Sequence, residues 1–160
     1  MKTVIIYHSY SGTTRGLAER VRDVTGGDLV EVRPRQPYSR LTAYTLGIIR
    51  ARGGDRDPIE PSSIDVSTYD RIVLGTPVWA GRATPVVNGA VDALLGAEGR
   101  TAVLFATCGA QTGETFPSLR AALEAKGVRV TGEFAFTKKE IGDARKIAAL
   151  NAAVTIPDGS

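Results

Sequence analysis

The sequence predicts an α/β fold in which helices cover both faces of a five-stranded parallel sheet. Short apolar, β-branched segments alternate five times with longer amphipathic segments. This alternation is typical of an open, doubly wound parallel sheet. Right-handed crossovers leave few possible topologies for such a sheet. Ligands of these folds bind beyond the carboxyl ends of the strands, so we expect the functional residues in the turns that follow strands.

The five expected strands are runs of apolar and β-branched residues. Residues 3–7 are nearly all apolar, as expected for a strand buried on both faces of a parallel sheet. The remaining strands are expected at 28–32, 70–76, 100–107 and 128–136.

The first expected helix, residues 13–24, follows the first strand. It places Leu17, Val21 and Val24 on one face, at the spacing of an amphipathic helix. The glycine pair that begins at Gly26 predicts its end.

A second well-marked helix is expected over residues 84–95. Thr84 suits the N-cap and Pro85 suits the first helical position. The other expected helices are a short one over 39–52, one from about Pro117 to Gly127, and one over 140–154.

Length and composition narrow the class of protein. With 160 residues, of which 42% are apolar and 23% charged, we expect one globular domain over 1–156 and a frayed tail at 157–160. The net charge of +3 is too small to indicate nucleic-acid binding. A single cysteine excludes a disulfide framework and a four-cysteine zinc site, and it fits a reducing cytoplasm. No apolar run is long enough for a membrane span, and we expect no metal site.

The turns after the strands exclude several other doubly wound proteins. The chain lacks the Gly-x-Gly-x-x-Gly of dinucleotide-binding folds and the Gly-x-x-x-x-Gly-Lys-Ser/Thr of nucleoside triphosphatases. A phospho-acceptor regulator needs aspartates at strand ends that here carry His8, Ser9, Thr76 and Pro77. A small tyrosine phosphatase needs an arginine in the loop after its cysteine, and residues 109–114 contain none.

The turn after the first strand, residues 9–14, is rich in hydroxyls and carries no charged side chain. The N-terminus of the following helix offers free N–H groups and a partial positive charge, which together attract anions. A helix cap needs one hydroxyl, whereas this turn has four, so the pattern favours a phosphate site. Because lysine and arginine are missing from the turn, the site suits a phosphate that is held and not transferred.

Three motifs together resemble those of the flavodoxin family. SYSGTT (9–14) resembles its phosphate loop, GTPVWAG (75–81) its loop with an aromatic over the flavin, and ATCGAQTG (106–113) its loop with a Cys-Gly pair beside the ring. They follow the first, third and fourth expected strands, and the resemblance covers nearly the whole chain. It implies a flavodoxin-like sheet of order 2-1-3-4-5 and non-covalently bound FMN as the cofactor.

The resemblance assigns FMN-binding roles to residues of the three loops. These are Ser9, Tyr10, Ser11, Gly12, Thr13 and Thr14 in the first, Thr76, Pro77, Val78, Trp79, Ala80 and Gly81 in the second, and Thr107, Cys108, Gly109, Gln111 and Gly113 in the third.

By the same resemblance Trp79 covers one face of the flavin, a contact worth about 1 kcal/mol beyond area burial. The backbone near Ala80 and Gly81 meets the flavin N5, although the family often has its glycine directly after the aromatic. The third loop lacks the family's usual stacking tyrosine, so the ring is expected to be covered mainly on one face.

Two side chains near these loops have competing interpretations. Cys108 is expected to pack against the pyrimidine side of the flavin with Gly109, or to be a small buried hydrophobe, and not to act as a nucleophile. The only histidine, His8, is expected to be structural or solvated.

These observations favour an FMN-binding electron carrier without catalytic side chains, acting between redox partner proteins as a monomer or homodimer. The alternatives are an NAD(P)H:quinone reductase or protoporphyrinogen dehydrogenase-like flavoenzyme, and a non-flavin domain of the same fold. Residues 33–57 hold six arginines against two aspartates, and a solvated surface is the favoured interpretation. The second is a basic docking patch for an acidic partner.

Overall fold

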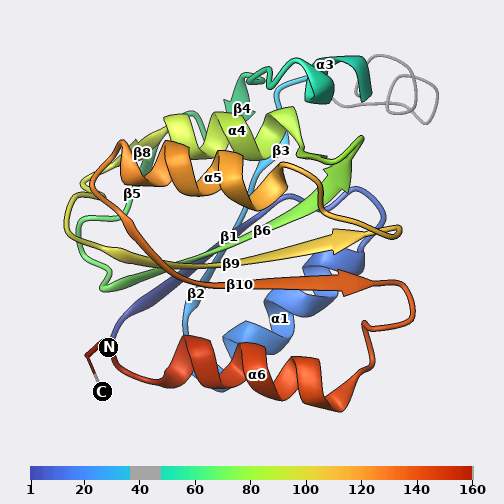
Figure 1. The fold of residues 1–160 in the computed structure, drawn as a ribbon. Coiled ribbons are helices and arrows are strands. Elements are labelled where there is room, and N and C mark those ends of the chain that lie inside the picture. Colours follow the sequence, from blue (N-terminus) through green and yellow to red (C-terminus); the bar gives the residue numbers. More distant parts are fainter. Residues whose placement is uncertain (37–47, 160) are drawn as a thin grey trace.

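The computed structural model describes residues 1–36 and 48–159, and its centre is a parallel sheet (Figure 1). The sheet has the order β10-β9-β6-β1-β2, which in chain order is the expected 2-1-3-4-5. The doubly wound fold is therefore confirmed. Its parallel strands are β1 (Thr3–Tyr7), β2 (Asp28–Glu31), β6 (Arg71–Trp79), β9 (Thr101–Cys108) and β10 (Arg129–Thr137).

Helices cover both faces of this sheet, and each face has its own apolar core (Figure 1). α4 and α5 pack on one face and α1 and α6 on the other, as the two core clusters show. All of β1 is buried between these layers, which explains its unbroken apolar sequence. The helices are α1 (Thr13–Thr25), α3 (Ile48–Arg52), α4 (Pro85–Asp92), α5 (Thr115–Glu124) and α6 (Ala144–Thr155).

Short strands supplement the main sheet. β7 extends it as the return strand of a hairpin with β6, and the others form two small two-stranded pairs, β3–β4 and β5–β8. Their bounds are β3 (Arg33–Pro34), β4 (Ile59–Glu60), β5 (Ile64–Asp65), β7 (Arg82–Ala83) and β8 (Leu94–Leu95).

The end of α4 differs from the expectation. The helix was expected to reach Leu95, but it ends at Asp92, and the next residues form β8. Leu94 is buried and pairs with Ile64 of β5, so burial and strand pairing end the helix early. Its start is as expected, because the hydroxyl of Thr84 accepts a hydrogen bond from the Val87 amide at 3.3 Å.

Two other helix starts are shifted. α5 begins at Thr115, two residues before the expected Pro117, because a proline in the first turn costs no intrahelical hydrogen bond. α6 begins at Ala144 and not at 140, because the Asp143 carboxylate caps it by accepting from the amides of Arg145 and Lys146 at 2.9 and 3.2 Å. Of the helix expected over 39–52, the described part is helical only at Ile48–Arg52, and residues 39–47 lie outside the described residues.

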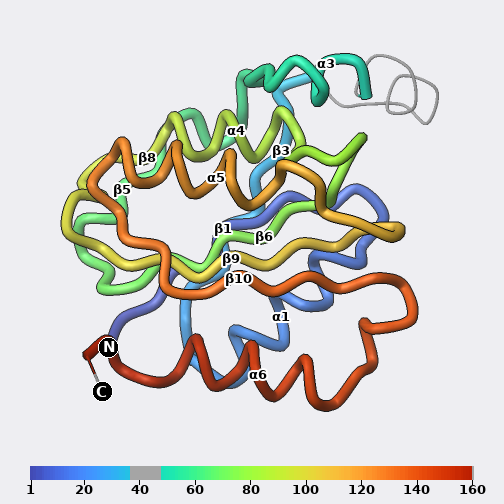
Figure 2. The backbone as a smooth tube through the Cα atoms, viewed as in Figure 1, coloured from blue at the N-terminus to red at the C-terminus, as the bar shows by residue number. Residues whose placement is uncertain are grey.

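The tail after Ile156 contacts the sheet through Asp158. Arg71, 1% exposed, donates to the carboxylate of Asp158 at 2.5 Å and to the Ala153 carbonyl at 3.0 Å. Thr101 donates to the other oxygen of the same carboxylate at 2.5 Å. Both chain ends lie at the end of the sheet opposite the loops after β6 and β9 (Figure 2). The loops after β6 and β9 therefore lie away from both chain ends.

Candidate functional site

The three motif loops meet at the carboxyl ends of adjacent strands. β6 lies between β1 and β9, with Tyr7 opposite Gly75 and Pro77 opposite Thr107. The first loop leads into α1, the second is the end of β6 with its hairpin turn, and the third leads into α5. The sheet thus brings together the three groups of residues that the sequence singles out.

In the first loop, the side chain of Ser9 organises the backbone. Its hydroxyl oxygen accepts hydrogen bonds from the amides of Gly12 at 3.0 Å and Arg15 at 3.2 Å. Gly12 precedes α1 with φ of 95°, a left-handed conformation that favours glycine. The amides of Thr13 and Thr14 fall in the first helical turn, where no intrahelical acceptor is available.

This loop fits a phosphate group. A Cβ built on Gly12 would meet no atom within 4 Å, so the space in front of the turn is open. The hydroxyls of Ser11 and Thr13 lie 3.2 Å apart at the exposed rim. Free amides, hydroxyls and the positive end of the α1 dipole are the donors that bind phosphate at helix N-termini.

A charged cluster that was not predicted from the sequence lies beside this loop. The guanidinium of Arg15 forms an ion pair with Glu31, and Arg33 binds the other oxygen of that carboxylate at 2.8 Å. Burial raises the pKa of Glu31, but the two guanidinium groups outweigh it and hold the pKa below its usual value. The sequence signal that could have indicated this cluster was the position of Arg15 in the first turn of α1. The ion pair with Glu31 holds the Arg15 guanidinium on β2, and the three groups together carry one net positive charge beside the phosphate loop.

Trp79 lies half-buried at the end of β6, with two aromatic rings edge-on to it. The ring centroids of Tyr10 and His8 are each 6.0 Å from that of Trp79, at interplanar angles of 85° and 76°. Such edge-to-face contacts favour a defined ring orientation. Tyr10 is 42% exposed, so this group of rings faces solvent on the side of the first loop.

His8 is a structural residue, in agreement with one of its two interpretations. It is 3% exposed, and its Nδ1 lies 2.9 Å from the hydroxyl of Thr84, which caps α4. Burial lowers the pKa of His8 to about 4, although the charge of Glu31 raises it somewhat. The imidazole is therefore neutral at pH 7, and it connects β1, Trp79 and α4.

The second loop is a two-residue hairpin turn. Trp79 pairs with Arg82 across the hairpin, and the two residues between them, Ala80 and Gly81, have φ of 52° and 73°. Two positive φ values are typical of a type I′ turn, which normally uses asparagine or glycine first. Ala80 is the one described non-glycine residue with positive φ, so its backbone is strained.

The third loop contacts both of the others. The hydroxyls of Thr107 and Thr14 lie 3.0 Å apart, and the Glu114 amide donates to the Gly81 carbonyl at 2.8 Å. A Cβ added to Gly113 would lie only 2.7 Å from that same carbonyl oxygen. The second and third loops therefore touch backbone to backbone, and only glycine fits between them.

Cys108 is half-buried at the end of β9. Its thiol donates to the carbonyl of Phe136 at 3.7 Å, and burial raises its pKa above the usual value. A thiol of this kind is protonated at neutral pH and is a poor nucleophile. Gly109 and Gln111 are exposed in the same loop.

The described residues offer neither a metal cluster nor a membrane-spanning helix. No group of three or more histidine, cysteine, aspartate or glutamate side chains there could hold a metal ion. Over the same part of the chain, none of the helices has the length and apolarity needed to span a membrane.

Comparisons with solved structures give the same fold. A candidate flavoprotein from Bacteroides eggerthii superimposes with a TM-score of 0.79 at 24% identity, covering 98% of this chain and 99% of that one. A flavoprotein from Lactobacillus acidophilus, solved in complex with FMN, gives 0.67 at 21% identity over 92% and 98%. The flavodoxin of Megasphaera elsdenii gives 0.63 at 18% identity over 95% and 97%. A search of curated proteins finds no sequence match.

Sequence comparison with families is decisive. A family model described as flavodoxin matches residues 2–128, a region that contains all three motif loops. The family expected from those loops is therefore confirmed, and this chain belongs to the flavodoxin family.

Proposed function

We propose that this protein binds FMN non-covalently at the three loops and transfers electrons between redox partners. The observation that carries the proposal is the joint placement of an open, uncharged phosphate loop and an oriented Trp79 at the same edge of the sheet. These are the two ends of a site for a ligand with a phosphate at one end and a flat ring at the other.

The residues present would share the work of holding this cofactor. The amides of Thr13 and Thr14 and the hydroxyls of the first loop would bind the phosphate. Trp79 would stack on the ring, and its position is supported by His8 and Tyr10. The flavin supplies the electron-transfer chemistry when it is bound, so this chain needs only to bind it, orient it and shield one face.

A docking patch on the arginine-rich segment receives little support from the structure. Arg33 pairs with Glu31, Arg35 with Glu60, and Arg56 with Asp92. Arg50 likewise pairs with Asp57. Among the described residues this segment is mainly an ion-paired, solvated surface, while residues 37–47, with Arg40, lie outside them. The proposed partner is therefore a redox protein whose docking face need not be acidic.

A flavoenzyme with a small second substrate is the other candidate. The described third loop has no aromatic residue between 107 and 113, so only Trp79 and its neighbours offer ring stacking there. This would leave room over the flavin for a substrate such as a quinone. One structural neighbour, at a TM-score of 0.62 and 17% identity, is an NADH:FMN oxidoreductase, and it supports only the fold.

Reduction of the FMN-loaded protein separates these functions. The proposed carrier should consume NADPH with a quinone no faster than free FMN does, and should be reduced by a partner reductase. Fast turnover of NADPH and quinone by the protein alone would favour the enzyme. Well-folded protein that neither copurifies with flavin nor binds added FMN would contradict both.

A further inference from the structure

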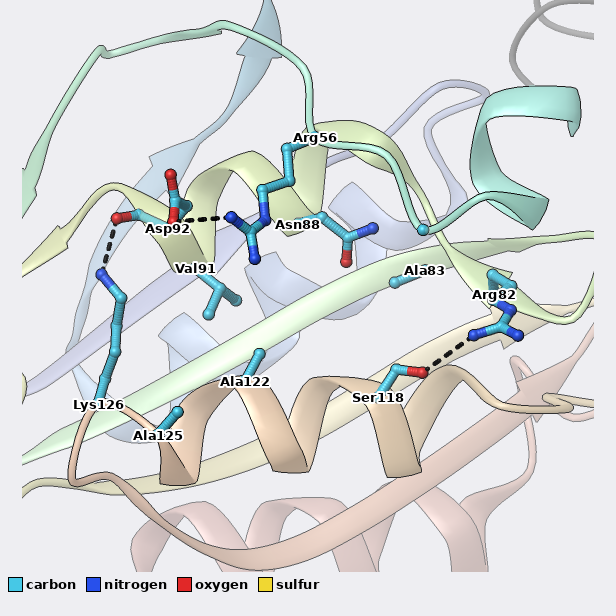
Figure 3. Close-up of a pocket in the computed structure, with 11 residues that line it drawn as sticks. Arg56, Arg82, Ala83, Asn88, Val91, Asp92, Ser118, Ala122, Ala125 and Lys126 are labelled. Carbon is cyan, nitrogen blue, oxygen red and sulfur yellow. Dashed lines mark hydrogen bonds and ion pairs between the residues drawn. The ribbon is translucent and has the colours of Figure 1, made fainter.

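A second concave surface lies between α4 and α5, and none of the residues assigned to FMN line it. It is a groove of ≈ 410 Å³, within the range of about 300–1,000 Å³ that small-molecule sites usually have. Figure 3 shows side chains of both helices and of the segment before α4 around it. Its lining residues are Gly54, Arg56, Arg82, Ala83, Asn88, Val91, Asp92, Ser118, Ala122, Ala125 and Lys126.

The groove is basic. It has three cationic side chains, Arg56, Arg82 and Lys126, against the single carboxylate of Asp92. That carboxylate lies 3.3 Å from Arg56, and both groups are mostly exposed. Lys126 donates to the carbonyls of Asp92 and Leu94 at 2.7 and 3.0 Å, and no carboxylate of the described residues pairs with it. The groove therefore has an excess of positive charge.

Arg82 is the cation best placed to bind a ligand. Its guanidinium donates to the hydroxyl of Ser118 at a long 3.4 Å, and it has no carboxylate partner in residues 1–36 and 48–159. Figure 3 shows Arg82 and Lys126 at opposite ends of the groove, with Asn88 on α4 between Arg56 and Arg82. The guanidinium of Arg82 and the hydroxyl of Ser118 can both donate hydrogen bonds to a phosphate.

The floor of the groove is apolar and consists of short side chains. Ala83 and Val91 are buried, and Ala122 of α5 packs against the same core. Alanines along this face of α5 leave the space between the helices open, where larger side chains would fill it (Figure 3). An apolar floor with cationic groups at its ends suits a ligand with an organic body and an anionic group.

We propose that the α4–α5 groove binds a small organic phosphate of about mononucleotide size, with its phosphate at Arg82 and Ser118 and its body over Ala83, Val91 and Ala122. The groove shares the β6–β7 hairpin with the second flavin loop through Arg82 and Ala83, but it uses none of the residues assigned to FMN, and the proposal does not depend on the proposed function.

Calorimetric titration with AMP, adenosine and inorganic phosphate tests the proposal on the full chain, first without FMN and then with FMN in excess. AMP should bind in both states, and tighter than adenosine or phosphate alone. Amide NMR signals of residues 82, 118 and 122 should shift. If AMP shifts only residues 9–14 and is displaced by FMN, it occupies the flavin phosphate loop and the groove proposal is wrong.

Variants of groove residues test whether AMP binds in the groove. Arg82→Gln should weaken AMP binding about tenfold or more. Because Arg82 lies in the hairpin, Ala122→Leu offers a second test, since it fills the floor without touching that turn. Arg120→Gln is the matched control, because Arg120 pairs with Glu133 and Glu124 and does not line the groove. Equal AMP affinity in the folded Arg82→Gln and Ala122→Leu variants would overturn the proposal. If FMN fails to bind while AMP still shifts the groove, only the flavin function is lost.

Discussion

The candidate flavin site and the α4–α5 groove present their hydrogen-bond donors in different ways. At the candidate flavin site the donors are the free backbone amides at the N-terminus of α1, in a loop whose shape Ser9 holds, and the neighbouring Arg15 is ion-paired with Glu31. In the groove the donors are the charged ends of Arg56 in the segment before α4, Arg82 in the hairpin and Lys126 just after α5. The first site is defined by backbone shape, the second by side-chain charge.

This difference decides which changes each site should tolerate. Backbone-defined recognition fails when a loop is displaced, because its amides cannot reorient one at a time. Charge-defined recognition weakens when a cation is removed or when salt screens it. A rise of about tenfold in ionic strength should therefore weaken AMP binding in the groove more than FMN binding at the loops.

Displacing the flavin loops should have the largest effect. Gly113→Val puts a branched side chain where even a Cβ lies 2.7 Å from the Gly81 carbonyl, at a φ of 52° that valine avoids. We expect FMN affinity to fall about a hundredfold by loop separation. Fluorescence titration with FMN measures this. Gly142→Ala is the control, because its Cβ meets nothing within 4 Å. Unchanged FMN affinity in the folded valine variant would show that contact between the loops is not needed.

Low pH should have the next largest effect, because it weakens the contact by which His8 supports Trp79. The pKa of His8 is about 4 in the folded chain and near 6.5 when unfolded, so only the unfolded chain gains a proton between these values. The free energy of unfolding should therefore fall by roughly 3 kcal/mol as pH drops from 7 to below 4. Urea unfolding followed by Trp79 fluorescence measures this. His8→Asn should lack that part of the pH dependence, and identical pH profiles for the two proteins would contradict the buried, neutral imidazole.

Removal of the Ser9 hydroxyl should have a smaller effect. Ser9→Ala leaves the amides of Gly12 and Arg15 without their acceptor and loosens the phosphate loop. FMN binding should weaken about tenfold, at low and high salt alike. Ser62→Ala, an exposed serine away from the loops, serves as the control. A loss that disappears at high salt would mean that charge, and not backbone geometry, governs this site.

Relief of the strained turn should give the smallest effect. Ala80→Gly removes the left-handed strain of an alanine, partly offset by the greater entropy of glycine in the unfolded chain. We expect a gain of about 0.5–1 kcal/mol in the free energy of unfolding, measured in urea without flavin. Gly81→Ala, at φ of 73°, should change stability in the opposite direction. Destabilisation by Ala80→Gly would contradict the strain assigned to this turn.

Much of the fold and of the flavin site could be predicted, because both follow local patterns. Apolar runs identified the five strands, and Gly12 and Gly26 mark the two ends of α1. The loops are contiguous motifs at strand ends, so parallel topology alone brings them together. Predicted and observed elements differ where contacts between residues far apart in the sequence determine the end of an element. The pairing of Leu94 with Ile64, for example, ends α4 early.

The remaining features depend on long-range packing that no local pattern records. Arg71 and Asp158 are 87 positions apart, and their ion pair holds a tail that looked free in the sequence. Arg15 and Glu31 come together only because α1 packs beside β2. The α4–α5 groove likewise needs two helices and a hairpin before Arg82 and Ser118 can meet.

The central claim is that FMN lies with its phosphate at the first loop and its ring on Trp79, the only tryptophan in the chain. Titration of flavin-free protein with FMN and with riboflavin, followed by tryptophan fluorescence, tests both ends of this placement at once. We predict strong quenching by one equivalent of FMN and at least tenfold weaker binding of riboflavin, which lacks the phosphate. FMN binding that leaves Trp79 fluorescence unchanged, or equal affinity for both flavins, would contradict it.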